Sequence, residues 1–157
     1  MLLIANRGNL FGRQRERENS PEYLNEAISL GYHVLIDLWY HDHCFWFGDR
    51  HPQNTNKTYK PHIDWLAYAS NSVLLQARNA EALLEASKQG LNVFWHQSDS
   101  YAYTTWGNLL AFYDSPGSGD STIRIVPTRE FSVDNQYIED LLTQGTQCSA
   151  LCSDHVG

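Results

Sequence analysis

The chain has 157 residues, a formal net charge of −7 and 42% hydrophobic residues. This length predicts a single compact domain over residues 1–157, and the negative charge argues against nucleic-acid binding, which needs a basic face. Three cysteines give neither a disulfide framework nor the paired spacing of a metal knuckle, which indicates a reduced, cytoplasmic setting. There is no apolar run of about 18 residues, so we expect no membrane span.

Apolar runs and turn residues predict alternating strands and helices over the first hundred residues. Residues 2–6 form the first expected strand. A helix is predicted over Pro21–Leu30, because Asn19-Ser20 can cap its start and Gly31 can end it. The remaining expected elements are a strand over Val34–Trp39, a hairpin partner over Cys44–Phe47, a helical turn over Ile63–Leu66, a strand over Val73–Ala77, a helix over Ala80–Gln89 and a strand over Val93–His96.

After residue 100 the pattern predicts strands with almost no helix between them. We expect strands over Tyr103–Thr105, Leu110–Tyr113, Thr122–Val126 and 147–152, and one helix over Asp134–Gln144. A total of about eight strands and three good helices favours a compact TIM-type (β/α)8 barrel with several outer helices shortened or missing. Such a barrel would leave strand faces uncovered, so we expect a possible homo-oligomer.

Polar residues stand where several of the expected strands end. In parallel α/β folds, such residues build the site. The segments are Asn6-Arg7-Gly8, Leu35-Ile36-Asp37, Gly48-Asp49-Arg50-His51-Pro52-Gln53, Gln76-Ala77-Arg78-Asn79, Phe94-Trp95-His96 and Cys152-Ser153-Asp154. A basic cluster of Arg7, Arg13, Arg15 and Arg17 follows the first strand, and we interpret it as a solvated loop rather than a phosphate-binding patch.

The order and spacing of these segments resemble the glycerophosphodiester phosphodiesterase and phosphatidylinositol-specific phospholipase C superfamily, especially its small microbial and viral members. Asn6-Arg7-Gly8 stands where the family has His-Arg-Gly, and Leu35-Ile36-Asp37 where it has Glu-x-Asp. The segment from Gly48 to Gln53 resembles Gly-His-Asp-x-Pro-Gln, Arg78-Asn79 stands at Lys-Asn, and the closing Cys-Ser-Asp also resembles the family. The resemblance spans nearly the whole chain.

The resemblance implies a metal-dependent phosphodiesterase with two histidines as general acid and base, but three expected positions are substituted. Asn6 has no proton to exchange near neutral pH, Asp49 is a poor acid there, and Leu35 offers no metal ligand. Asp37 remains of the metal pair, and Asp154 is a further candidate ligand. We therefore expect either no cofactor or a weakly bound divalent cation, Mg²⁺ or Ca²⁺.

The positions that keep polar side chains suggest binding without catalysis. The candidate ligand-binding residues are Asn6, Arg7, Arg78 and Asn79, and an arginine can hold a phosphate in a forked geometry. We predict a catalytically degenerate phosphodiesterase-like barrel that binds a phosphorylated or anionic small molecule at the C-terminal ends of its strands.

Two alternatives stay open. An active enzyme could use a relocated acid/base pair around a metal, with candidate residues Asp49, His51 and His96 for catalysis and Asp37 and Asp154 for the metal, and with His41 and His43 close to them in sequence. The chain could instead be a compact scaffold that has no ligand.

Overall fold

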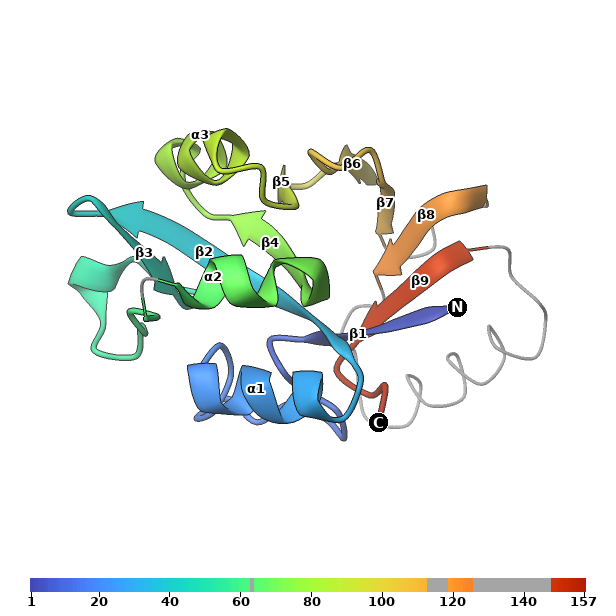
Figure 1. Cartoon of the computed structure of the whole chain (residues 1–157), viewed down its shortest axis with the longest axis horizontal. Coiled ribbons are helices and arrows are strands. Elements are labelled where there is room, and N and C mark those ends of the chain that lie inside the picture. Colours follow the sequence, from blue (N-terminus) through green and yellow to red (C-terminus); the bar gives the residue numbers. More distant parts are fainter. Residues whose placement is uncertain (63, 113–118, 126–147) are drawn as a thin grey trace.

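A computed structural model describes residues 1–62, 64–112, 119–125 and 148–157 (Figure 1). The strands are β1 (Leu2–Asn6), β2 (His33–His41), β3 (Cys44–Phe47), β4 (Val73–Ala77), β5 (Val93–Trp95), β6 (Tyr101–Tyr103), β7 (Leu109–Phe112), β8 (Gly119–Ile125) and β9 (Cys148–Ser153). The α-helices are α1 (Pro21–Ser29), α2 (Trp65–Ala69) and α3 (Ala80–Lys88), with short 3-10 turns at Pro52–Asn54 and Ser70–Ser72.

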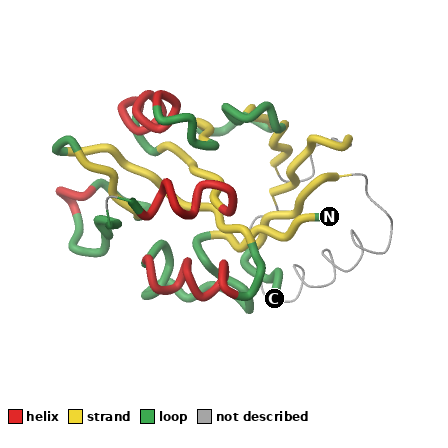
Figure 2. Tube along the Cα trace, in the orientation of Figure 1, coloured by secondary structure: helices red, strands yellow, loops and turns green. Residues whose placement is uncertain are grey.

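The strands form one mixed sheet that curls into a nearly closed barrel (Figures 1 and 2). Its order is β5-β4-β2-β1-β9-β8-β7-β6, and β3 pairs with β2 beside this path. Neighbours are parallel except for the antiparallel pairs β6–β7 and β2–β3. Thr105, just after β6, connects the two ends of this strand order by hydrogen bonds to Val93 of β5. Its N–H donates to the Val93 carbonyl at 2.9 Å, and its side-chain oxygen accepts from the Val93 N–H at 3.0 Å.

The predicted TIM-type (β/α)8 barrel is wrong, because the described chain is a mixed strand-rich barrel with only three short α-helices. The reason is clearest between β6 and β7. Their connection is a tight turn, closed by the Thr104 N–H to the Asn108 carbonyl at 3.0 Å, and the Thr104 hydroxyl also accepts from the N–H groups of Trp106 and Asn108. A turn of this length joins antiparallel strands, whereas a parallel crossover needs a dozen residues or more.

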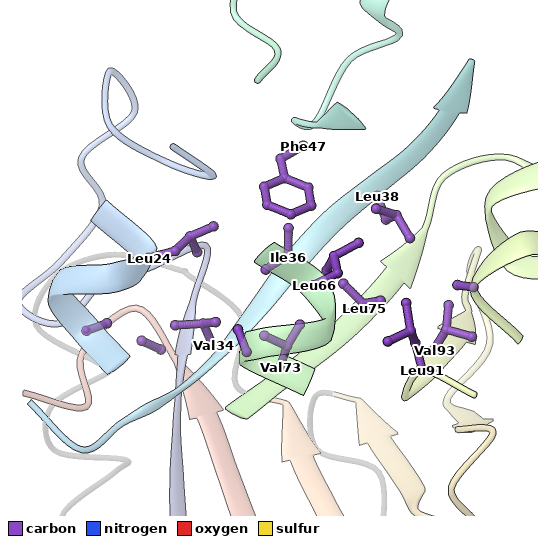
Figure 3. Close-up of a cluster of buried hydrophobic side chains, with 14 of the residues drawn as sticks. Leu24, Val34, Ile36, Leu38, Phe47, Leu66, Val73, Leu75, Leu91 and Val93 are labelled. Carbon is purple, nitrogen blue, oxygen red and sulfur yellow. The ribbon is translucent and has the colours of Figure 1, made fainter. Parts of the chain in front are cut away.

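The three helices cover the outer faces of β2, β4 and β5 (Figure 1), and the main apolar core lies between them. The α1 helix starts where the Ser20 hydroxyl accepts from the Tyr23 N–H, with Pro21 as its first residue. Outward-facing residues of β2 alternate with inward ones, as the pleat requires. Figure 3 shows the resulting cluster of Leu24 from α1, Leu66 from α2, Val34, Ile36 and Leu38 from β2, Val73 and Leu75 from β4, and Phe47, Leu91 and Val93.

A second apolar cluster fills the barrel interior with the residues that alternate with the first set. It contains Ile4, Leu35, Leu74, Phe94, Leu110, Phe112, Ile123, Ala150 and Cys152. Leu35 and Asp37 therefore lie on the same inward face of β2, two residues apart. Leu35 belongs to the apolar layer, and Asp37 lies one layer nearer the C-terminal ends of the strands.

Most of the predicted elements are present, with shifted ends. The β2 strand runs on to His41 because it pairs with β3, and β6 ends at Tyr103 because Thr104 begins the turn. The helical turn predicted at Ile63–Leu66 is observed as α2, and residue 63 lies outside the described residues, as does the predicted helix Asp134–Gln144. Among the described residues no helix is both long and apolar enough to cross a membrane.

Candidate functional site

A buried network of charged and amide side chains lies at the C-terminal ends of β1, β2 and β9. Its three carboxylates, Glu18, Asp37 and Asp154, are buried in the fold. The network includes five of the residues predicted from the sequence, namely Asn6, Arg7, Asp37, Arg78 and Asp154.

The Asp37 carboxylate is fully buried and is already surrounded by cations and donors. Arg78 donates to Oδ1 through Nε at 2.8 Å and also through Nη2. Arg7 places its Nε 2.7 Å from Oδ2, and the Asn19 side-chain amide donates to the same oxygen at 3.0 Å. A metal ion would have to displace these groups before Asp37 could serve as a ligand.

The loop that carries Arg7 and Asn19 is held in place by its backbone. Both residues adopt left-handed conformations, with φ of 55° and 63°, and asparagine tolerates this region better than most residues. The Asn19 N–H donates to the Arg7 carbonyl at 3.1 Å, and the Asn19 side-chain oxygen accepts from the Asp37 N–H at 3.0 Å. Asn19 therefore contacts both the backbone and the carboxylate of Asp37, and fixes the loop against the end of β2.

Glu18 neutralises the other side of Arg7. It accepts from Arg7 Nη1 at 3.2 Å, from Arg13 Nε at 2.9 Å and from the Asn9 amide at 3.0 Å. Burial alone would raise the pKa of Glu18, but the hydrogen bonds from Arg13 and Asn9 and the charges of both arginines lower it below its ordinary value. Burial would likewise lower the pKa of Arg7, yet the Asp37 and Glu18 carboxylates raise it.

Asp154 lies at the end of β9 and joins the two ends of the chain. Its Oδ1 accepts from the Asn6 amide at 3.0 Å and from the Asn9 amide at 2.7 Å, and its carbonyl accepts from the Gly12 N–H at 2.7 Å. Asn6 thus stabilises a carboxylate, a role that an amide can fill without exchanging a proton.

Asp49 is exposed and lines a pocket that adjoins the network, whereas the three other predicted site residues lie elsewhere. Asn79 caps the start of α3. Its side chain also makes two hydrogen bonds to the backbone of Tyr40: the oxygen accepts from the Tyr40 N–H at 3.1 Å, and the amide nitrogen donates to the Tyr40 carbonyl at 2.8 Å. His51 accepts from the Gln53 N–H at 3.2 Å. His96 stacks on Phe112, with ring centroids 3.6 Å apart. These three residues do not join the Asp37 network.

An open pocket of about 400 Å³ adjoins the network through Glu18 and Asn19. Its lining is rich in charge: Arg13, Arg15, Glu16, Glu18, Asn19, Gly48, Asp49, Arg50, Thr55, Lys57 and Tyr59. Lys57 is paired with Glu16 at 2.7 Å. Arg15 and Arg50 are exposed, and within the described parts of the chain neither forms an ion pair.

Sequence reasoning did not find Glu18 or Asn9, which complete the network. Both residues lie in the loop between the first strand and the first helix, which also carries Arg7 and Arg13. A carboxylate and an amide so close in sequence to two arginines could have been predicted to pair with them. The basic cluster is not a uniformly solvated loop, since Arg7 and Arg13 pair with the buried Glu18. Arg15 alone of the four is left without a carboxylate among the described residues, because Arg17 pairs with Glu26 at 2.5 Å.

No group of three or more His, Cys, Asp or Glu side chains placed to hold a metal ion is found in the described residues. His41 and His51 do approach each other, with ring centroids 4.9 Å apart in an edge-on arrangement. They line a separate open pocket with His43, Asp42 and Glu81, away from Asp37.

The Glu18 contacts predict a pH-dependent contribution to stability. The pKa of Glu18 in the folded chain lies below its ordinary value of 4.5, so its stabilising contribution is complete above pH 4.5 and is lost as the pH falls through the folded value. In urea unfolding between pH 7 and pH 3, Glu18→Gln should therefore lose less stability on acidification than the wild type. Glu22→Gln, at an exposed position in α1, is the matched control and should follow the wild type. Parallel curves for wild type and Glu18→Gln would contradict this prediction.

Comparisons of this chain with protein-family models, with curated proteins and with solved structures found no match in any of the three.

Proposed function

We propose that the protein binds a phosphorylated or other anionic small molecule without hydrolysing it, in the pocket beside the Asp37 network. The observation that carries this proposal is the pairing of Asp37 with Arg7 and Arg78. At the position where the resemblance implies a metal ligand, two guanidinium groups already neutralise the carboxylate. Leu35, at the second implied ligand position, belongs to the apolar interior.

The charges around the pocket support an anion as the ligand. In the Asp37 network the cations Arg7, Arg13 and Arg78, which are partly exposed, match the three buried carboxylates in number, and each carboxylate already has donors. At the pocket, Arg15 and Arg50 carry two positive charges without an ion pair among the described residues, against one such carboxylate, Asp49. Guanidinium groups bind phosphate and carboxylate oxygens with two parallel hydrogen bonds, which suits a ligand held between two arginines.

The same side chains support the proposed lack of catalysis. Asn6 is engaged with Asp154 and offers no titratable proton, and His51 and His96 lie outside the network. Loss of a general acid or base typically costs ~10²–10⁴-fold in rate. We therefore propose that glycerophosphodiesters are not turned over, whichever divalent cation is supplied.

The binding half of the proposal is tested with glycerol 3-phosphate and with uncharged glycerol. By isothermal titration calorimetry at low salt, glycerol 3-phosphate should bind and glycerol should not. Arg50→Gln and Arg15→Gln should each weaken binding by about tenfold or more, because each removes a charge-assisted hydrogen bond. Arg17→Gln is the control, since Arg17 is half-exposed and pairs with Glu26 outside the pocket lining. Equal affinity in all three variants would rule out this pocket as the site.

The catalytic half is tested separately with glycerophosphocholine and bis-nitrophenyl phosphate. With Mg²⁺, Ca²⁺ or Mn²⁺ present, release of product should not exceed that of buffer with the same metal. Metal-dependent turnover that disappears in Asp37→Ala or His51→Ala would instead support an active enzyme with a relocated acid/base pair.

A further inference from the structure

The pocket that contains Arg15 and Arg50 is lined by two separate segments. Residues 13–19, between β1 and α1, supply one side, and residues 48–59, which follow β3, supply the other. Among the described residues one ion pair joins the two sides, since the Lys57 Nζ lies 2.7 Å and 3.0 Å from the two carboxylate oxygens of Glu16. Both side chains belong to the pocket lining. A ligand in the pocket would therefore meet this pair.

Backbone hydrogen bonds hold the segment that carries Glu16. The N–H groups of Arg17 and Glu18 donate to the Gln14 carbonyl at 2.8 Å and 3.1 Å, which encloses Glu16 in a turn. The Gln14 N–H donates to the Asn9 side-chain oxygen at 3.0 Å. The backbone at Glu16 is thus tied to the Asp37 network.

The segment that carries Lys57 is held in a similar way. Tyr59 exchanges two backbone hydrogen bonds with Phe47 of β3, at 2.7 Å and 2.8 Å, and the Lys57 N–H donates to the Thr55 side-chain oxygen at 3.1 Å. Gly48 packs so closely against this segment that a Cβ atom there would lie 3.3 Å from the Lys57 carbonyl oxygen. The backbone is therefore held on both sides of the pocket, and the side chains of the ion pair are the adjustable part.

The two side chains of the ion pair are in contact with solvent. The Lys57 side chain is 61% exposed and the Glu16 side chain 79% exposed. Exposed ion pairs contribute little to stability, so exchanging one partner for another costs little. The Lys57 ammonium has three donors on a flexible stem. An anion can therefore replace Glu16 as its partner without a movement of either backbone segment.

A phosphate group is a stronger partner for Lys57 than the Glu16 carboxylate is. A phosphate monoester carries a charge of about −1.5 to −2 at pH 7 and three acceptor oxygens, whereas the carboxylate carries a single charge. The exchange leaves Glu16 unpaired, but its exposed carboxylate stays hydrated and is not buried without a partner. The exchange is therefore favourable, although it is weakened by the need to break the existing pair.

We propose that Lys57 is a third ligand-binding cation of this pocket, and that Glu16 occupies it until a phosphate replaces the carboxylate. This inference rests on the proposed anion site and adds a restraint to it. Each binding event must break the bond between Glu16 and Lys57, so Glu16 lowers the affinity of the pocket for anions.

The affinity for glycerol 3-phosphate, measured by isothermal titration calorimetry at low salt, tests this restraint. Glu16→Gln should raise the affinity about three- to fivefold, the upper range for one exposed ion pair. In the Glu16→Gln background, Lys57→Met should then lower the affinity about tenfold, because a charge-assisted hydrogen bond is lost with no competing carboxylate. In the wild type the same change should cost only about two- to threefold, because part of the gain from Lys57 is spent on breaking the pair.

Asp49→Asn is the matched control, because it removes from the same lining a carboxylate that has no ion pair among the described residues. It should also raise the affinity through its charge. In this background, however, Lys57→Met should cost no more than in the wild type, since Glu16 still pairs with Lys57.

The outcomes separate this inference from the proposed anion site itself. If the wild type binds glycerol 3-phosphate but Lys57→Met has the same effect in all three backgrounds, or Glu16→Gln brings no gain, the role of Lys57 and Glu16 is overturned and the anion site stands. If neither the wild type nor Glu16→Gln binds, both proposals fail. Binding by Glu16→Gln that Lys57→Met abolishes would support the inference even where the wild type binds too weakly to measure.

Discussion

Asp37→Asn should destabilise the protein by about 2–3 kcal/mol, because it replaces a fully buried carboxylate that pairs with two partly buried arginines by a neutral amide. Arg7 and Arg78 converge on this group from two different segments, and Asn19 binds it as well. The asparagine side chain would keep the shape but not the charge. Urea unfolding at neutral pH, followed by circular dichroism, measures the change in the free energy of unfolding.

Asp42→Asn is the matched control for this change. Asp42 is exposed in the β2–β3 turn with φ of 50°, a conformation that asparagine also tolerates, so the expected change is within about 0.5 kcal/mol. Arg78→Gln should fall between the two, since Asp37 would keep Arg7 and Asn19. If Asp37→Asn proved as mild as Asp42→Asn, the network would not be the stabilising feature that its geometry implies.

Leu35→Glu should be at least as damaging, by about 3 kcal/mol or more at neutral pH, because it places a carboxyl group in the apolar interior. The size of the loss should also depend on pH. Burial raises the pKa of a carboxyl group in the folded state, while the unfolded chain keeps a value near 4.3. The unfolded chain alone then ionises as the pH rises above about 4.3, so the loss of stability should grow between pH 4 and pH 8.

Leu35→Gln separates the charge from the change in shape. It should destabilise the fold by an amount that does not change over the same pH range, because the amide does not titrate. The triple variant Asn6→His, Leu35→Glu and Asp49→His restores the residues that the resemblance implies at the three substituted positions. Stabilisation of this variant by Mg²⁺ or Ca²⁺, but not of Leu35→Glu alone, would support the placement implied by the resemblance.

Local signals were sufficient to predict much of the fold. The apolar run that becomes β4 and the cap and stop residues of α1 depend on neighbours in sequence, and both elements lie close to their predicted places. The direction of β6 depended instead on the turn at Thr104, whose hydroxyl accepts two backbone N–H groups. Serine and threonine make such bonds in many contexts, so the sequence alone did not distinguish this turn from a longer connection.

The sequence predicted which residues lie at the candidate site, but not which of them form ion pairs with each other. The strand ends identified Arg7, Asp37 and Arg78 as neighbours, because the carboxyl ends of parallel strands meet at one edge. The sequence did not show that both arginines would turn toward the same carboxylate. That outcome depends on the left-handed backbone at Arg7 and on the side chain of Asn19, which are properties of the assembled loop.

The bonds from Asn6 and Asn9 to Asp154 also bear on the order of events during biosynthesis. The donors are synthesised well before their acceptor, because sequence separations of 148 and 145 residues lie between them. The loop after β1 cannot reach its final state on a nascent chain, because the strand that completes its surroundings has not yet been made. Contacts of such long range slow folding and leave the early segment exposed while synthesis continues. A substitution at Asp154 should therefore disturb the loop after β1, which is distant in sequence but in direct contact with Asp154 in the fold.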